Sequence, residues 1–182
     1  MNSQEKERAK QVIVEIVRQA GGAFDNKTNL FKAFWLSHVH AIRDTGKALS
    51  HWPIVRMPRG PGIDNFDSLL GELLSDSMIA TETESIGQNE AMRFRLTSRA
   101  QESDSIGISQ AHRETIRSAA QAVMSMTASQ ASEWSHEKSR SWQSSRDGDE
   151  LDIVLDSMTD DEIESRLTKS KMLMSKLNSA LS

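Results

Sequence analysis

Residues 28–46 read TNLFKAFWLSHVHAIRDTG, and this segment decides the fold class. Its apolar side chains recur at helical spacing but nearly encircle the axis, which predicts a central helix buried on all sides. We expect this helix to begin near Thr28 and to end near Thr45 and Gly46. The apolar positions are Leu30, Phe31, Phe34, Trp35, Leu36, Val39 and Ile42.

Further segments on both sides show a one-sided apolar stripe, which is typical of amphipathic helices. The first covers about residues 4–20 and stops at two glycines. Another covers about residues 109–127, and a short helix or turn follows at residues 129–134. A leucine-rich helix is predicted between the first and the second of these stripes. Its apolar residues Phe66, Leu69, Leu70, Leu73 and Leu74 stand at i, i+3, i+4, i+7 and i+8.

The segment between the central helix and the leucine helix, GKALSHWPIVRMPRGPG at residues 46–62, holds all three prolines of the chain. Proline fixes φ and lacks a backbone donor, so this segment is predicted to form neither a helix nor a central strand. Trp52 and its apolar neighbours disfavour disorder. We therefore expect an ordered surface loop that carries recognition.

Apolar and basic residues alternate at residues 92–96, which is typical of a half-buried strand. Residues 79–84 are predicted to pair with it across a turn at residues 87–89. Glu82 and Glu84 are candidate cross-strand partners of Arg93 and Arg95. The predicted fold is mainly α, with a helical core, one winged-helix-like β-hairpin and a C-terminal amphipathic helix.

The C-terminal helix is predicted to open with a capping box at residues 159–162, with additional acid in its first turn. Its apolar stripe is expected to lie in a groove on a partner protein or on a second copy of the chain. The alternative is that the stripe packs back on the core. We divide the chain into a helical domain at residues 1–158 and this helix at residues 159–182. The stripe consists of Ile163, Leu167, Met174, Leu177 and Leu181.

Composition limits the function classes. The chain has 182 residues, a net charge of −4, a pI of about 5.8 and no cysteine, so disulfides and thiolate chemistry are excluded. No apolar run approaches the length of about 18 residues that spans a membrane. The charged start of the chain lacks the apolar core of a secretory signal, so we expect a cytoplasmic protein.

Histidine is the residue most able to carry catalysis here, and the five histidines form no known motif. His136 and Glu137 begin like a zinc protease signature, but the second histidine of that signature is replaced by Arg140. We expect no catalytic residue, metal or cofactor. An enzyme assembled from scattered His, Glu and Arg residues is a rival interpretation.

A leucine-rich helix followed by a hairpin is also typical of a winged-helix DNA-binding domain. In such a domain Arg93, Arg95 and Arg99 could contact DNA phosphates. Acidic residues in the same elements would repel the DNA backbone, so nucleic acid is not the expected partner. A DNA-binding regulator remains the alternative function. The acidic residues are Asp64, Asp67, Glu72, Asp76, Glu82, Glu84 and Glu90.

The tryptophans and two arginines supply candidate contacts. Trp35 belongs to the core, whereas Trp52, Trp134 and Trp142 lie in loop-like segments and are either lids over the core or interface anchors. The side chains of Arg56 and Arg59 flank the Gly60-Pro61 turn, where they could pair with a partner's carboxylates or stay solvated.

Two groups of residues carry a resemblance to a known family. The first comprises Lys32, His38, Thr45-Gly46, Leu49 and Gly60-Pro61 before the leucine helix, and the second comprises Ser135-His136, Trp142 and Asp147-Gly148. In this order they resemble the SocA-like Panacea antitoxin domain over about residues 28–153. Members often carry a tyrosine between the two glycine turns, whereas this chain has none and Ile54 lies near that place.

The resemblance implies a non-enzymatic, mostly helical domain that neutralises a protein toxin of a bacterial or phage toxin–antitoxin system. We expect residues 46–62 and 135–142 to pack together, with Gly46, Gly60, Pro61 and His136 holding their shape and His136 as a buried, hydrogen-bonded histidine. The final helix lies outside the resemblance and is a candidate for partner choice. The candidate partner-binding residues are Trp52, Arg56, Arg59, Trp134, Trp142, Ile163, Leu167, Met174 and Leu177.

Overall fold

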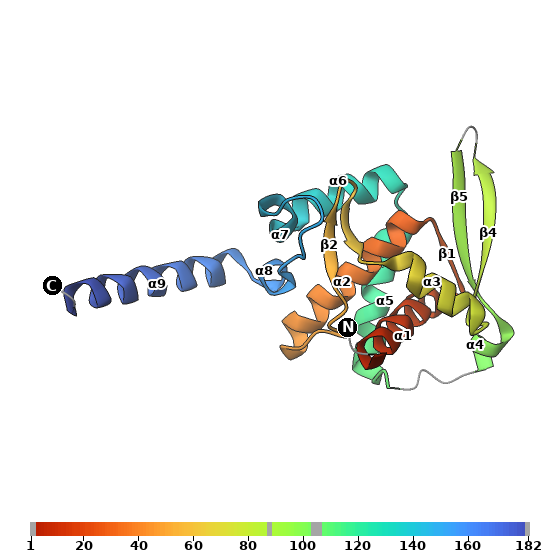
Figure 1. Ribbon diagram of the computed structural model, residues 1–182, viewed down its shortest axis with the longest axis horizontal. Coiled ribbons are helices and arrows are strands. Elements are labelled where there is room, and N and C mark those ends of the chain that lie inside the picture. Colours follow the sequence, from red (N-terminus) through yellow and green to blue (C-terminus); the bar gives the residue numbers. More distant parts are fainter. Residues whose placement is uncertain (1–2, 87–88, 103–106, 181–182) are drawn as a thin grey trace.

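A computed structural model describes residues 3–86, 89–102 and 107–180 (Figure 1). Helix α2 (Lys27–Thr45) passes through its centre. The side chain of Asn26 caps its start by accepting a hydrogen bond from the Asn29 amide, and Gly46 ends it in the left-handed conformation at φ 72°. The central buried helix is therefore confirmed.

Helices α1 (Ser3–Gln19) and α5 (Gln110–Met124) pack against α2 through the stripes predicted from their spacing. Helix α6 (Ala128–Lys138) is longer than the predicted turn, because a capping box between Thr127 and Gln130 starts a full helix. Three short helices were not predicted: α4 (Ser98–Glu102), α7 (Arg140–Ser144) and α8 (Ile153–Ser157). Each has five residues, too few for a periodic signal.

The predicted hairpin forms from β4 (Ile79–Ile86) and β5 (Asn89–Leu96), and β1 (Ala23–Asp25) joins β5 to complete an antiparallel sheet of order β1-β5-β4. Glu82 pairs with Arg95 at 2.7 Å, as expected. Arg93 pairs with Asp25 on the unpredicted strand, at 3.1 Å. Residues 87 and 88 of the predicted turn, and the side chains of Glu84 and Glu90, lie outside the described part.

The order α1, β1, α2, α3 (Phe66–Ser75), β4, β5 is winged-helix-like, with a second hairpin inserted between α2 and α3. That hairpin consists of β2 (Ile54–Met57) and β3 (Gly60–Ile63), so part of the segment expected to be a surface loop forms a two-stranded sheet. Residues 46–62 contain neither a helix nor a central strand, as predicted. Pro61 is tolerated in β3 because it lies opposite Arg56, whose backbone bonds instead to Gly148 and Asp149.

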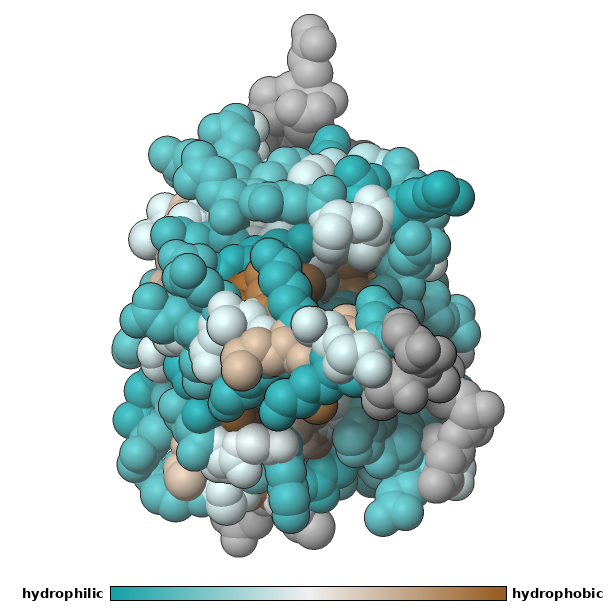
Figure 2. Space-filling model, turned by 90° about the vertical axis from the view of Figure 1, so that its left-hand side faces the viewer, coloured by the Kyte–Doolittle hydropathy of each residue, from teal (hydrophilic) through white to brown (hydrophobic). Residues whose placement is uncertain are grey.

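Helix α9 (Asp160–Ala180) leads away from the rest of the molecule (Figure 1). Its predicted capping box is present, since Thr159 and Glu162 bond reciprocally. Leu167, Met174 and Leu177 are 56–57 % exposed, so this part of the stripe does not pack back on the core. The face from which α9 projects is mostly hydrophilic, with a few apolar side chains visible among the polar ones (Figure 2). Leu181 lies outside the described residues.

Candidate functional site

The β2–β3 hairpin and the α6–α7 segment, far apart in sequence, lie side by side. Trp142 Nε1 donates to the Met57 carbonyl oxygen at 2.9 Å, and Arg56 Nε donates to the Trp142 carbonyl oxygen at 3.0 Å. At the tip of the hairpin, Ser132 Oγ donates to the Arg59 carbonyl oxygen at 3.1 Å. Residues 46–62 thus pack against residues 135–142, as the sequence indicated.

The Trp142 ring is a centre of stacking in this contact. The His136 ring lies parallel to it, with centroids 3.8 Å apart and planes inclined by 9°. The Arg56 guanidinium carbon lies 4.2 Å from the Trp142 ring, and Arg56 also pairs with Asp147. Burial, and the positive charges of Lys32 and Arg56, lower the pKa of His136, so its imidazole is neutral near pH 7.

The expectation that His136 is a buried, hydrogen-bonded histidine is wrong. Its side chain is only half-buried, and its enclosed Nε2 has no hydrogen-bond partner among the described residues. Stacking on Trp142 holds the ring in place instead. The hydrogen bond was predicted because buried imidazoles usually make one. Residue spacing gives no signal for ring stacking.

Lys32 brings a buried positive charge to the hairpin from α2. Its side chain is 1 % exposed, and Nζ donates to the Pro61 carbonyl oxygen at 2.8 Å. Burial lowers the pKa of Lys32 to about 7. Gly60 makes this approach possible, because its φ is +96° and a Cβ there would clash with Ser135 Oγ and lie 2.8 Å from Lys32 Nζ.

The Asp156 carboxylate joins α2, α7 and α8, and sequence analysis missed it. Its Oδ2 accepts hydrogen bonds from Trp35 Nε1, Ser139 Oγ and Ser141 Oγ, and its Oδ1 accepts from the Ser141 amide, each at 2.8 Å. Asp156 is 6 % exposed, so four donors satisfy a buried acid. No sequence signal pointed to this position, because the donors come from segments that the fold brings to Asp156.

The three tryptophans of the loop-like segments have different environments. Trp52 is 3 % exposed and donates from Nε1 to the Asp64 carbonyl oxygen at 2.8 Å, so it belongs to the core. Trp134 is half-buried and meets Trp35 edge to face, with ring centroids 5.9 Å apart. Trp142 is also half-buried, whereas Arg59 at the hairpin tip is exposed.

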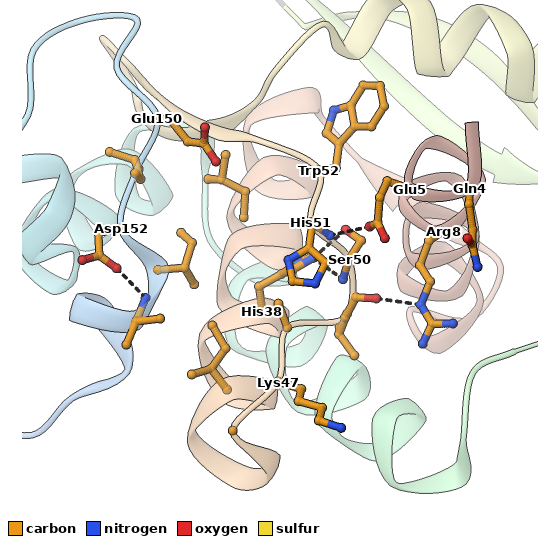
Figure 3. A pocket seen from close by; sticks show the side chains of 18 residues that line it. Gln4, Glu5, Arg8, His38, Lys47, Ser50, His51, Trp52, Glu150 and Asp152 are labelled. Carbon is orange, nitrogen blue, oxygen red and sulfur yellow. Dashed lines mark hydrogen bonds between the residues drawn. The ribbon is translucent and has the colours of Figure 1, made fainter. Parts of the chain in front are cut away.

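A cavity of about 710 Å³ opens beside the start of the proline-rich segment (Figure 3). His38 Nε2 lies 2.9 Å from Ser50 Oγ there, while His38 Nδ1 lies 2.8 Å from the Phe34 carbonyl oxygen. A serine beside a histidine is the pair that nucleophilic catalysis uses. Burial lowers the pKa of His38 to about 4, so the imidazole is a weak base. The Ser50 amide also donates to Nε2, at 3.2 Å, which suits an anchor for the loop.

Several charges of the winged-helix-like part are paired within the chain. Glu72 on α3 contacts Lys6 and Lys10 of α1, and Asp76 contacts Lys10 at 2.8 Å. The arginines of β5 pair with the carboxylates described above. Helix α3 therefore presents acids to α1, an arrangement that does not favour contacts with DNA phosphates.

Within residues 3–86, 89–102 and 107–180, no group of three or more His, Cys, Asp or Glu side chains is placed to hold a metal ion. None of the helices described there combines the length and apolar character needed to cross a membrane.

Comparison with protein-family models finds a match to the antitoxin SocA-like Panacea domain over residues 30–143. The matched range contains Lys32, Gly60, Pro61, His136 and Trp142, and it ends before α8 and α9. No curated protein and no solved structure matches the chain.

Proposed function

Because the chain belongs to the SocA-like antitoxin family with a Panacea domain, we propose that it binds and neutralises a cognate protein toxin. The family match over residues 30–143 carries this proposal. The toxin would be a component of a bacterial or phage toxin–antitoxin system, encoded beside this chain and met in the cytoplasm. Neutralisation by binding requires no cofactor and no bond to be made or broken.

The proposed division of the chain falls at about residue 158. Asp156 still belongs to the buried network with Trp35, and Arg140 donates to the Met158 carbonyl oxygen at 2.6 Å. Beyond this point, α9 has one half-buried residue, Ile163, near its start and is otherwise exposed through residue 179. We assign the Panacea-like helical domain to residues 1–158 and partner choice to residues 159–182.

The first proposed contact surface is the apolar stripe of α9. Its positions are spaced alternately by four and three residues, which is the 3.5-residue period of a helix that packs along another helix or in a groove. Leu167, Met174 and Leu177 leave apolar area in water that a partner would cover. The stripe in the described residues consists of Ile163, Leu167, Met174 and Leu177, with Ser170 between them.

The second proposed surface lies around the tip of the β2–β3 hairpin. Arg59 is exposed there, and the half-buried Trp134, Trp142 and Arg56 follow along the contact with α6 and α7. Half-buried tryptophan and arginine side chains are favoured anchors in interfaces. Trp52 is left out of this surface because its ring is covered by the core.

Co-expression tests the proposal directly. The protein encoded by the adjacent reading frame should arrest growth when produced alone, and the present chain should relieve the arrest and co-purify with that protein. Relief without co-purification, or a purified chain that turns over a small substrate, would contradict neutralisation by binding. A dimer of the chain alone, lost when α9 is removed, would assign the stripe to self-association.

A further inference from the structure

A cavity of about 400 Å³ lies between the tip of the β2–β3 hairpin and the first turns of α2. Among the described residues that line it, three are cations and none carries a carboxylate. Its other walls are largely apolar, so the cavity combines positive charge with hydrophobic surface. The cations are Lys27, Lys32 and Arg59, and the apolar walls come from Phe31, Met57 and Pro58.

The three cations differ in how they are satisfied. Lys27 pairs with Asp67 at 2.8 Å and lies over the rings of Phe31 and Phe66. Neither Lys32 nor Arg59 has a carboxylate partner among the described side chains. The Lys32 ammonium has three donors, and the Pro61 carbonyl oxygen is the one acceptor described for it. Donors at Lys32 are therefore left for a ligand.

A carboxylate suits the Lys32 side of this cavity better than a neutral group does. A buried ammonium without a counter-charge is costly, and a carboxylate would bring both the opposite charge and acceptor oxygens. The titratable groups near Lys32 are Lys27 and Arg59, which line the same cavity, and His136 on α6, and none of these three is an acid. Burial lowers the pKa of Lys32 to about 7, so the empty cavity loses part of its charge at neutral pH.

The surroundings favour an extended chain over a compact small molecule. A second hollow of about 340 Å³ shares Pro58 and Arg59 with the first and continues to Ser132 and Glu133 on α6. One polypeptide crossing the hairpin tip could occupy both hollows, whereas a small acid would fill only one. We propose that the Lys32 cavity receives the side-chain carboxylate of a glutamate or aspartate from a partner polypeptide. That this polypeptide is the toxin rests on the proposed function.

The test uses the isotope-labelled full chain and two peptides that differ only in charge, acetyl-Leu-Glu-Leu-amide and acetyl-Leu-Gln-Leu-amide. At pH 6.5 the glutamate peptide should shift the amide resonances of Phe31, Lys32 and Gly60 and bind about tenfold more tightly than the glutamine peptide, as a charge-assisted contact implies. Lys32→Met should abolish this preference. Lys47→Met, which removes an exposed lysine elsewhere, should retain it.

Two further measurements keep the proposal falsifiable if Lys32→Met does not fold. Arg59→Gln, at an exposed position, should weaken binding of the glutamate peptide and leave binding of the glutamine peptide unchanged. Raising the pH from 6.5 to 8.5 should weaken binding of the glutamate peptide but not of the glutamine peptide, because Lys32 loses its proton over this range.

Equal binding of the two peptides would overturn the proposal. So would hexanoate binding more tightly than the glutamate peptide, because the cavity would then be a site for small acids. None of these measurements involves a toxin, so their failure leaves neutralisation untouched. Conversely, a chain that neutralises nothing can still show the peptide preference.

Discussion

Helices α2 and α9 have nearly the same length, 19 and 21 residues, but opposite surroundings. Leu30 and Phe34 on α2 are 0 % exposed, whereas Leu167 and Leu177 on α9 are 56 % and 57 % exposed. Full burial of a leucine contributes about 1.5–3 kcal/mol, so α2 stabilises the fold and α9 leaves that free energy available for a partner. The difference separates the residues that make the domain from those proposed to choose its partner.

The largest expected effect comes from a matched pair of leucines on the two helices. Leu30→Ala should lower the free energy of unfolding by about 2–5 kcal/mol, because it leaves a cavity in the core. Leu177→Ala should change it by less than about 0.5 kcal/mol, because the side chain is already in water. Denaturant unfolding followed by circular dichroism measures both. Similar losses in the two variants would mean that α9 packs on the body in solution.

The Asp156 network tests where the body ends. Asp156→Ala should lower the free energy of unfolding by about 3 kcal/mol, because it leaves the donors of Trp35, Ser139 and Ser141 buried without the Asp156 carboxylate. Tryptophan fluorescence during unfolding reports both stability and the environment of Trp35. Asp161→Ala, at an exposed position in the first turn of α9, is the control and should have little effect. If Asp156→Ala changed the free energy of unfolding as little as Asp161→Ala, residues 153–157 would not belong to the folded unit.

This contrast also shows what the sequence could predict. Period 3.6 revealed α2, and the capping box of Thr159 and Glu162 marked the start of α9. The three-residue strand β1 and the five-residue helices carry too few positions for any period. The β2–β3 hairpin was missed because the sequence argument did not consider that a proline can occupy a strand position where no backbone amide is needed. Pro61 has such a position, since it lies opposite Arg56, whose backbone bonds to Gly148 and Asp149.

Lys32 provides a prediction about pH. Its folded pKa of about 7 lies below its ordinary value of 10.5, so between these values the unfolded chain holds a proton that the folded chain has released. The free energy of unfolding should therefore gain up to about 1.4 kcal/mol per pH unit from this group as the pH rises above 7. Lys32→Met removes the contribution.

The measurement is the difference in unfolding free energy between the original chain and Lys32→Met at pH 7, 8 and 9. That difference should move in favour of the original chain as the pH rises. A constant difference would show that Lys32 keeps its ordinary pKa and that its side chain reaches water in solution.

The smallest expected effect on stability comes from removing α9 altogether. A chain that ends at Met158 should unfold within about 0.5 kcal/mol of the full chain, because the residues removed are almost all exposed. Chemical denaturation of the two chains checks this. A truncated chain that fails to fold would make α9 part of the core.

The candidate site was less predictable than the fold. The residues that resemble the family, such as Lys32, Gly60 and His136, were found, and the structure brings them around one hairpin. Their contacts were not foreseen, because spacing carries no signal for the stacking of His136 on Trp142, and because the burial of Lys32 depends on segments that are distant from it in the sequence. The Asp156 carboxylate was missed for the same reason.

The most direct test of toxin binding through α9 is isothermal titration of the purified full chain with the protein from the adjacent reading frame. Leu167→Ser combined with Leu177→Ser disrupts the stripe, and Met172→Ser is the control, because Met172 is equally exposed but lies on another face of α9. We predict a loss of affinity of at least about 1.4 kcal/mol, or tenfold, for the double variant and no change for the control. Unchanged affinity of the double variant would contradict the role assigned to α9.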